Sequence, residues 1–210
     1  IISRLTGIPS LISAVSGLGT LFISDKLKTK ILRILLLPIY KFAFNHKNQK
    51  IIIQNEDDLK SLEDWGVLKS SKVKLLKGSG VKLEDFKNIK DPEGVITISF
   101  AGRLLRDKGV LEFISAAAIL KKRGIVARFF LAGDFDINNP SGISPEDLTK
   151  INKDNYVEIL GYQSDIPALY EKSHIVCLPS YREGLPKCLI EAAAAGKSIV
   201  TTNVPCLLHI

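Results

Sequence analysis

Two glutamates separated by a turn are the residues of this chain that point most directly to chemistry. Glu183 and Glu191 lie eight positions apart, and the sequence Gly-Leu-Pro directly follows the first of them. A short apolar run over residues 175–178 predicts a buried strand, and the alanine-rich segment after the turn favours a helix. The backbone N–H groups of Gly184 and Leu185 are therefore expected near a helix start, which binds phosphate, with carboxylates on either side for sugar hydroxyls.

Two cations form a second candidate group. Arg103 and Lys108 follow a predicted strand over residues 95–101 and lie at the start of a predicted helix over residues 108–123. The carboxyl ends of parallel strands are where open α/β sheets bind ligands. A guanidinium fork and an ammonium group at that edge suit the negative charge that develops on a departing phosphate. Without this context, the same two residues are typical of a solvated surface.

These segments resemble a known family. The paired glutamates resemble the motif of retaining glycosyltransferases of family 4, and residues 102–109 (GRLLRDKG) resemble that family's G-R-L-x-x-x-K-G segment. Residues 131–133 and 159–162 resemble its next strand end and its base-pocket segment. Residues 16–19 resemble a glycine turn in the first domain of enzymes that extend lipid-linked sugars. The resemblance implies an α/β fold with two facing Rossmann-like domains and parallel sheets.

The resemblance also implies roles for individual positions. It implies a catalytic group of Arg103, Lys108 and Glu183, in which the cations hold the donor diphosphate and the carboxylate contacts the donor sugar. Glu191 is implied to bind the ribose hydroxyls. Further donor-binding positions are implied at Gly184, Leu185, Gly17, Gly19, Gly133, Leu160 and Tyr162. A packing role for Tyr162 and a plain turn at Gly133 are equal alternatives.

No metal and no other cofactor is expected, because a nucleotide-sugar would be a substrate. The three histidines are scattered, and the three cysteines, Cys177, Cys188 and Cys206, lack the spacing of metal-ligand pairs. Two of these cysteines lie in apolar or helical settings, which is typical of buried thiols in a reducing cytosol. The expected location is therefore cytoplasmic, extending to a peripheral position on the inner face of the cell membrane.

Strands alternate with helices along the whole chain, which predicts parallel sheets. We expect residues 1–80 to form the C-terminal half of a first, acceptor-side domain and residues 81–94 to form a linker. Residues 95–210 would then form a truncated second domain that binds the nucleotide-sugar donor. Both sheets are expected to be incomplete. The chain lacks methionine altogether and begins with Ile1 and Ile2, which also indicates a fragment of a longer protein.

The positive charge is concentrated near the start of the chain. The net charge is +7, and residues 1–50 alone hold eight Lys or Arg against one Asp. Many of these cations fall on a predicted amphipathic helix over residues 26–46, which Arg33, Pro38 and Lys41 interrupt too often for it to span a membrane. Such a helix suits an anionic membrane surface, or equally a Rossmann helix with a solvated basic face. Nucleic acid is not an expected partner, because no recognition motif or aromatic platform accompanies the cations.

The residues and the resemblance together predict a retaining glycosyltransferase. It would move a sugar from a UDP-linked nucleotide-sugar donor to a growing, lipid-linked saccharide acceptor in surface glycan synthesis. One alternative is a sugar-nucleotide epimerase of the same architecture, although the extra acid–base residues that it needs are not evident. The other alternative is an inactive fragment that binds the donor or docks on a membrane.

Overall fold

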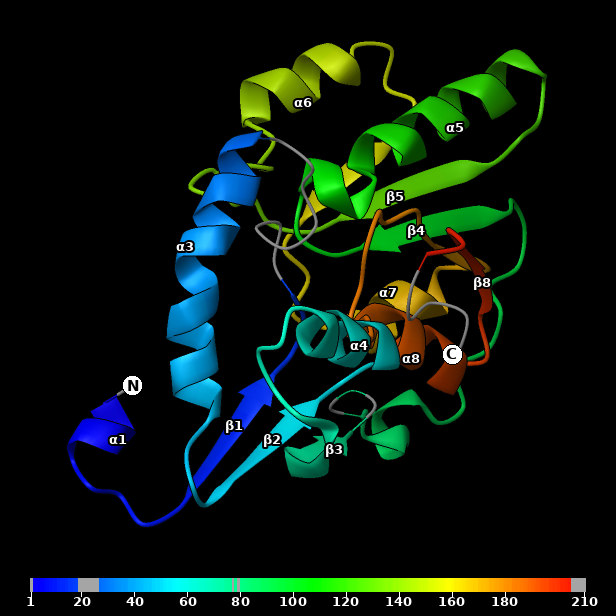
Figure 1. Ribbon diagram of the computed structural model, residues 1–210. Coiled ribbons are helices and arrows are strands. Elements are labelled where there is room, and N and C mark those ends of the chain that lie inside the picture. Colours follow the sequence, from blue (N-terminus) through cyan, green and yellow to red (C-terminus); the bar gives the residue numbers. More distant parts are fainter. Residues whose placement is uncertain (1, 19–26, 77, 79, 205–210) are drawn as a thin grey trace. The chain divides into compact units, whose positions relative to one another are not determined.

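The computed structural model describes residues 2–18, 27–76, 78 and 80–204, and these divide into two compact units, Ile1–Ser79 and Gly80–Ile210 (Figure 1). Each unit is built around its own parallel sheet and its own cluster of buried apolar side chains. The expected α/β class with parallel sheets is confirmed.

The first unit contains a three-stranded parallel sheet in the order β1-β2-β3. Its strands are β1 (Leu11–Val15), β2 (Gln49–Ile53) and β3 (Val73–Leu75), and its helices are α1 (Ile2–Leu5), α3 (Leu27–Phe44), α4 (Glu56–Asp64) and the short 3-10 helix η1 (Ser70–Lys72). The central strand supplies Ile51 and Ile53, both fully buried, which pack with Leu62 of α4. Burial alternates along β2, so Ile51 and Ile53 face the core while Ile52 between them is only partly buried.

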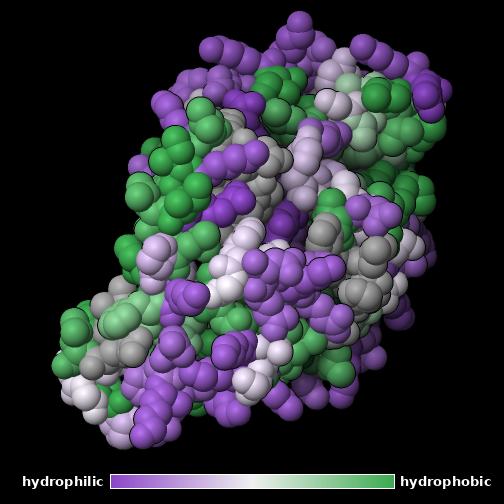
Figure 2. Space-filling view, in the orientation of Figure 1, coloured by the Kyte–Doolittle hydropathy of each residue, from purple (hydrophilic) through white to green (hydrophobic). Residues whose placement is uncertain are grey.

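Helix α3 is unusual because none of its residues is fully buried. Leu37, Tyr40 and Phe44 pack against the core from one side of the helix. Several large apolar side chains on the remaining faces are exposed, as the hydrophobic surface along α3 in Figure 2 shows: Leu27, Ile31, Leu32, Ile34, Leu35, Ile39 and Phe42. Within the described part of the chain, no helix is long and apolar enough to cross a membrane.

The second unit contains a five-stranded parallel sheet in the order β6-β5-β4-β7-β8. The strands are β4 (Thr97–Ala101), β5 (Arg128–Ala132), β6 (Glu158–Gly161), β7 (Ile175–Leu178) and β8 (Ser198–Thr201). The connecting helices are η2 (Leu83–Phe86), η3 (Arg106–Lys108), α5 (Val110–Lys122), α6 (Pro145–Ile151), α7 (Ile166–Glu171) and α8 (Lys187–Ala194). Helices α5 and α6 cover one face of this sheet, and α7 and α8 cover the other (Figure 1).

The strand order gives this sheet a point where the winding reverses. From β4 the chain adds β5 and then β6 on one side, and it then returns to place β7 and β8 on the other side of β4. The helices that follow β4 and β7, α5 and α8, consequently lie on opposite faces of the sheet. Open α/β sheets bind ligands in the crevice at such a reversal.

Residues 81–94, assigned above to a linker, lie within the second compact unit. Phe86 of η2 is 6% exposed and its ring lies 6.3 Å from that of Tyr170, the largest fully buried side chain of α7. Further along, the ammonium of Lys197 donates to the carbonyl of Lys90 at 2.9 Å and to the carboxylate of Asp91 at 2.8 Å. The segment is therefore packed against the sheet domain that follows it.

The contact between Asp91 and Lys197 should make the stability of the folded protein depend on pH. The hydrogen bond and charge of Lys197 hold the pKa of the Asp91 carboxyl below its ordinary value of about 3.9. A carboxyl with a lowered folded-state pKa stabilises the protein above its unfolded pKa, and that stabilisation is lost as the pH falls through the folded pKa. Asp91→Asn should thus lower the thermal midpoint at pH 7, and the gap to the wild type should narrow as the pH falls through the lowered pKa of the Asp91 carboxyl.

Thermal unfolding followed by circular dichroism from pH 7 to pH 2.5 measures this gap. Asp85→Asn is the matched control, because Asp85 is half exposed and pairs with the exposed Lys82 at 3.4 Å. A gap for Asp91→Asn that stays constant with pH would contradict the predicted linkage.

Candidate functional site

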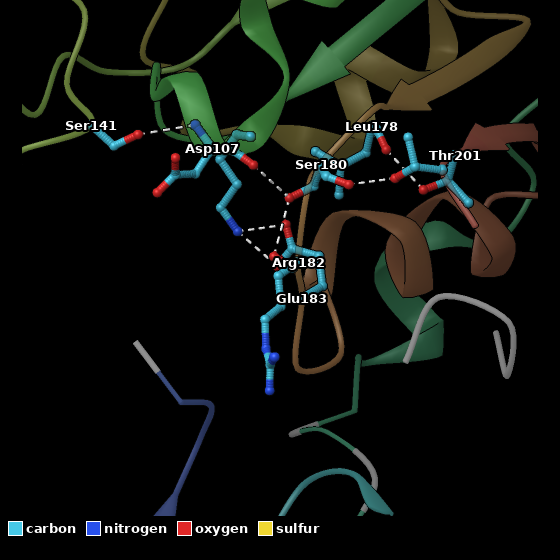
Figure 3. Close-up of polar contacts among 9 residues, drawn as sticks. Asp107, Ser141, Leu178, Ser180, Arg182, Glu183 and Thr201 are labelled. Carbon is cyan, nitrogen blue, oxygen red and sulfur yellow. Dashed lines mark hydrogen bonds and ion pairs between the residues drawn. The ribbon is translucent and has the colours of Figure 1, made fainter. Parts of the chain in front are cut away.

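The loops after β4 and β7 bring a cation and a carboxylate into direct contact. The Lys108 ammonium at the end of η3 lies 2.5 and 2.7 Å from the two carboxylate oxygens of Glu183. The side chains of these residues are 23% and 7% exposed, so the pair is largely removed from water. Figure 3 shows this contact within a connected set of hydrogen bonds. The structure therefore joins one member of each predicted group at the reversal of the sheet.

The two loops touch through their main chains as well. Gly109 has φ +77°, and a Cβ atom at this position would lie 2.0 Å from the carbonyl oxygen of Pro179. Only glycine allows this approach, because any side chain would collide with the backbone of the β7 loop. Gly109 is thus required for packing, and this packing also fixes the main chain next to Lys108.

Arg103 occupies a more open position than Lys108. Its guanidinium pairs with the Asp136 carboxylate at 2.9 Å, and its side chain is 60% exposed. The carboxylate of Asp136 belongs to the loop after β5, which lies beside β4 in the sheet. Arg103 is thus held at the same sheet edge as Lys108 but by a different acidic partner. Its role toward a donor stays a prediction.

Glu191 is buried on α8. Its side chain is 9% exposed and accepts from the Lys187 ammonium at 2.9 Å, one turn earlier in the helix. Pro186 is the N-cap residue of α8, and its side chain makes no capping hydrogen bond. A helix start without a side-chain cap suits a turn that accommodates an anion.

Cys188 lies near the ion pair, but it is a poor candidate for a nucleophile. Burial raises the pKa of its thiol to about 12, and the nearby carboxylate of Glu183 acts in the same direction. Burial likewise raises the pKa of Cys177 to about 11. Because the thiolate is the reactive form of cysteine, neither residue supports covalent catalysis at neutral pH.

The remaining predicted positions of the second unit line the same edge of the sheet. Gly133 directly follows β5. It lies so close to Gly102 that a Cβ atom at position 133 would lie 1.8 Å from the Gly102 carbonyl oxygen. The carbonyl of Leu160 accepts from the Gln163 side chain at 2.8 Å, and Tyr162 is 72% exposed. Gly184 and Leu185 lie between Glu183 and α8. Contact of these positions with a donor stays a prediction.

The glycine turn of the first unit is already engaged by a carboxylate. The backbone N–H of Leu18, next to Gly17, donates to the buried Asp58 carboxylate at 3.0 Å. Asn55 donates to the same carboxylate at 2.9 Å and accepts from the Asp58 N–H as the cap of α4. The N–H of Leu18 thus has an acidic partner within its own unit. Gly19 lies outside the described residues.

The sequence contains one acidic pair with an Asp-x-Asp spacing, Asp134 and Asp136. The Asp136 carboxylate is paired with Arg103, and the Asp134 carboxylate accepts from the backbone N–H of Phe135 at 2.8 Å. Within the described ranges, no group of three or more His, Cys, Asp or Glu side chains could hold a metal ion.

Several residues that shape this site were not predicted from the sequence. Ser180 is completely buried beside the ion pair, Asp136 holds Arg103, and Asp58 holds the glycine turn. The signal for Asp58 was present, because Asn55 followed three residues later by an acid is a helix-capping pattern. The contacts of Ser180 with Asp107 and of Asp136 with Arg103 carry no such local signal, since each joins residues more than 30 positions apart.

The fold and the placement of these residues define a family. Residues 81–210 match the family of group 1 glycosyl transferases. The match covers more than half of the chain, and the chain belongs to this family. The resemblance inferred from the paired glutamates is confirmed.

Among curated relatives, the chain is similar to the Campylobacter jejuni N,N'-diacetylbacillosaminyl-diphospho-undecaprenol alpha-1,3-N-acetylgalactosaminyltransferase. The two are 34% identical over 210 residues, which cover 93% of this chain and 53% of the relative. It is also similar to the Escherichia coli UDP-Gal:alpha-D-GlcNAc-diphosphoundecaprenol alpha-1,3-galactosyltransferase, with 25% identity over 97% of this chain and 54% of the relative. The chain thus spans about half the length of these two relatives.

Solved structures of glycosyltransferases share the fold. WaaG, a glycosyltransferase involved in lipopolysaccharide biosynthesis, superposes with a TM-score of 0.76 at 15% identity, over 99% of this chain and 63% of that one. Anabaena HepE in complex with UDP-glucose has a TM-score of 0.76 at 16% identity, over 99% and 57% of the two chains. At this identity the likeness establishes the fold alone.

Proposed function

We propose that this chain is part of a retaining glycosyltransferase that transfers a sugar from a UDP-linked donor to an undecaprenyl diphosphate-linked saccharide. The observation that carries the proposal is the contact of Lys108 with Glu183 beside the start of α8, at the reversal of the parallel sheet. A cation, a carboxylate and a helix start at one point suit a ligand with both phosphate charge and sugar hydroxyls.

The acceptor is inferred from the relatives. The Campylobacter and Escherichia coli enzymes are both named for acceptors joined to undecaprenol through a diphosphate, and the second is named for UDP-Gal as donor. For this chain, Lys108 and Arg103 would balance the charge of the departing nucleotide, while Glu183 would contact the sugar. Electrostatic stabilisation of this kind needs no protein nucleophile, which agrees with the high pKa of the Cys188 thiol.

Retention of the anomeric configuration is the finer part of the proposal. It is inferred from the resemblance of the paired glutamates to retaining glycosyltransferases of family 4. For such an enzyme we propose that the acceptor attacks the same face from which the nucleotide departs. In that route the donor phosphate accepts the proton of the acceptor hydroxyl. The epimerase alternative has no support among the relatives described above.

The test uses the full-length protein with a UDP-sugar and a synthetic undecaprenyl diphosphate-linked saccharide. We expect the product linkage to keep the anomeric configuration of the donor, as measured by NMR, and activity to persist in EDTA. An inverted linkage would overturn the retaining assignment, and loss of activity that Mg²⁺ or Mn²⁺ restores would contradict a metal-free site. Isomerised UDP-sugar formed without acceptor would favour the epimerase.

We also propose that α3 rests on the anionic membrane that carries the lipid-linked acceptor. The exposed apolar side chains Ile34 and Leu35 are 67% and 65% exposed, and Lys28 and Lys41 are exposed cations on the same helix. Apolar insertion combined with cationic flanks is the pattern of helices that lie in the plane of a lipid interface. Each cation near an anionic surface adds about 1 kcal/mol, which salt screens.

Vesicle co-sedimentation of the full-length protein tests this docking. Changing Lys28, Lys30 and Lys41 to Gln should lower binding to phosphatidylglycerol vesicles about tenfold or more at low salt, since each cation contributes about 1 kcal/mol. A control with Lys122, Lys150 and Lys153 changed to Gln removes the same charge from exposed sites of the second unit and should bind as the wild type does.

A second variant separates lipid from protein as the occupant of this helix face. Leu35→Asn should weaken vesicle binding without changing the thermal midpoint if lipid covers the face. A clear drop in the midpoint, with vesicle binding unchanged, would instead indicate that another part of the protein packs against α3 and would overturn the docking proposal.

A further inference from the structure

A single buried hydroxyl group connects the two loops that carry the ion pair. Ser180 has no exposed surface, and its hydroxyl lies 3.0 Å from the Asp107 carbonyl oxygen and 3.1 Å from that of Arg182. Asp107 immediately precedes Lys108, and Arg182 immediately precedes Glu183. The hydroxyl has one proton for two carbonyl acceptors, so it sits between the main-chain groups next to each member of the pair (Figure 3).

The main chain of Asp107 is held from two directions. Its carbonyl also accepts from the backbone N–H of Tyr181 at 3.0 Å, and its own N–H donates to the hydroxyl of Ser141 at 3.0 Å. All of these contacts are made by the main chain of Asp107, whereas its side chain is exposed. The position of η3 is consequently set by the β7 loop on one side and by the loop after β5 on the other.

The β7 loop is itself anchored to the next strand. The Thr202 hydroxyl donates to the carbonyl of Ser180, and the Thr201 hydroxyl donates to the carbonyl of Leu178 at 2.8 Å. Main-chain and hydroxyl contacts thus run from β8 through the β7 loop to η3, as the dashed lines in Figure 3 trace. Because Thr201 and Thr202 also hold the β7 loop, we expect loss of the Ser180 contact to loosen η3 more than the loop.

We propose that Ser180 is a positioning residue that fixes Lys108 opposite Glu183, and through them the charge geometry of the donor site. The inference rests on the proposed function for its consequence on the donor, but the placement of Lys108 can be measured without it. Without the hydroxyl, the carbonyls of Asp107 and Arg182 lose a shared donor, and the main chain of Asp107 keeps its contacts with Tyr181 and Ser141.

The chain offers a matched control on the other end of the same strand. Ser173 precedes β7 as Ser180 follows it, has no exposed surface, and donates from its hydroxyl to the Leu169 carbonyl at 2.7 Å. Ser173→Ala therefore removes a buried hydroxyl from the same domain, at the opposite edge of the sheet from Lys108. Any effect of Ser180→Ala that exceeds that of Ser173→Ala reports on position rather than on general stability.

The experiment measures how fast an amine-reactive ester acylates Lys108 in the full-length protein, by peptide mass spectrometry, together with donor KM. Ser180→Ala should raise the acylation rate and the donor KM about three- to tenfold, the size expected for one lost hydrogen bond, and leave the acceptor KM unchanged. Ser173→Ala should alter neither value. Glu183→Gln, which removes the partner of Lys108, marks the upper limit of acylation.

Acylation of Lys108 at the wild-type rate in Ser180→Ala would overturn the positioning role. Faster acylation with unchanged donor KM would support that role but contradict the proposed donor site, so the two failures are distinct. Ser141→Ala provides a second route should Ser180→Ala not fold. It removes the acceptor of the Asp107 N–H from the opposite side, and it should raise acylation in the same direction.

Discussion

Lys108→Gln is expected to lower kcat/KM for the nucleotide-sugar donor by about a hundred- to a thousandfold in the full-length protein. The ammonium is the least exposed cation at the proposed donor site, and removing one preorganised group that stabilises developing negative charge typically has an effect of about this size. The same change leaves the Glu183 carboxylate, only 7% exposed, without its partner. Breaking a buried pair from one side costs about 3–5 kcal/mol, and the partly exposed Lys108 places the expected loss at the lower end.

The double variant with Lys108→Gln and Glu183→Gln separates these two effects. It leaves no uncompensated charge, so urea unfolding should show most of the stability restored, while donor turnover stays low. Lys122→Gln, at an exposed position of α5, is the control and should match the wild type in both assays. Wild-type turnover in the folded single variant would remove Lys108 from the proposed site.

The largest loss of stability is expected from Gly109→Ala. The new methyl group would lie 2.0 Å from the Pro179 carbonyl oxygen, and the backbone at φ +77° is unfavourable for any residue with a Cβ. The positive φ alone costs about 1–2 kcal/mol, and a collision with main chain that cannot rotate away raises the expected total to about 4 kcal/mol or more.

Gly124→Ala isolates the conformational part of this cost. Gly124 has φ +74°, but no atom lies within 4 Å of a Cβ built there. It should therefore lose only about 1–2 kcal/mol in urea unfolding. Equal losses for the two variants would show that the η3 and β7 loops do not meet as closely as described, and would weaken the case for a preformed ion pair.

Local patterns were enough to predict the helices and strands. The apolar runs before Gly102 and Gly133 form β4 and β5. Asn55 and Ser144 are the N-caps of α4 and α6, and the side chain of each accepts a hydrogen bond from the first turn of its helix. These features depend on residues within a few positions of each other, so they can be recognised in the sequence. The resemblance of residues 102–109 and of the paired glutamates to one family was likewise a local signal, and the family was confirmed.

The partners of the site residues could not be predicted in the same way. Lys108 and Glu183 are 75 residues apart, and they meet because β4 and β7 are neighbours in the sheet. Arg103 finds Asp136 because β5 lies on the other side of β4. Strand order is decided by the packing of the whole domain, and no short segment encodes it. The sequence therefore identified the ionisable groups but not the pairs that they form.

The reversal of the sheet also sets the order in which the site can assemble. One edge of β4 pairs with β5, the next strand in the sequence. The other edge pairs with β7, which comes later in the chain, after β5, β6 and their helices. We expect this pairing to form more slowly than that of β4 with β5, because the loop that it closes is longer. A chain emerging from the ribosome can form β4, β5 and β6 before residue 175 exists, yet it has no acidic partner for Lys108 until β7 and its loop dock. The pairing of Lys108 with Glu183 is thus completed only when β7 and its loop join the sheet.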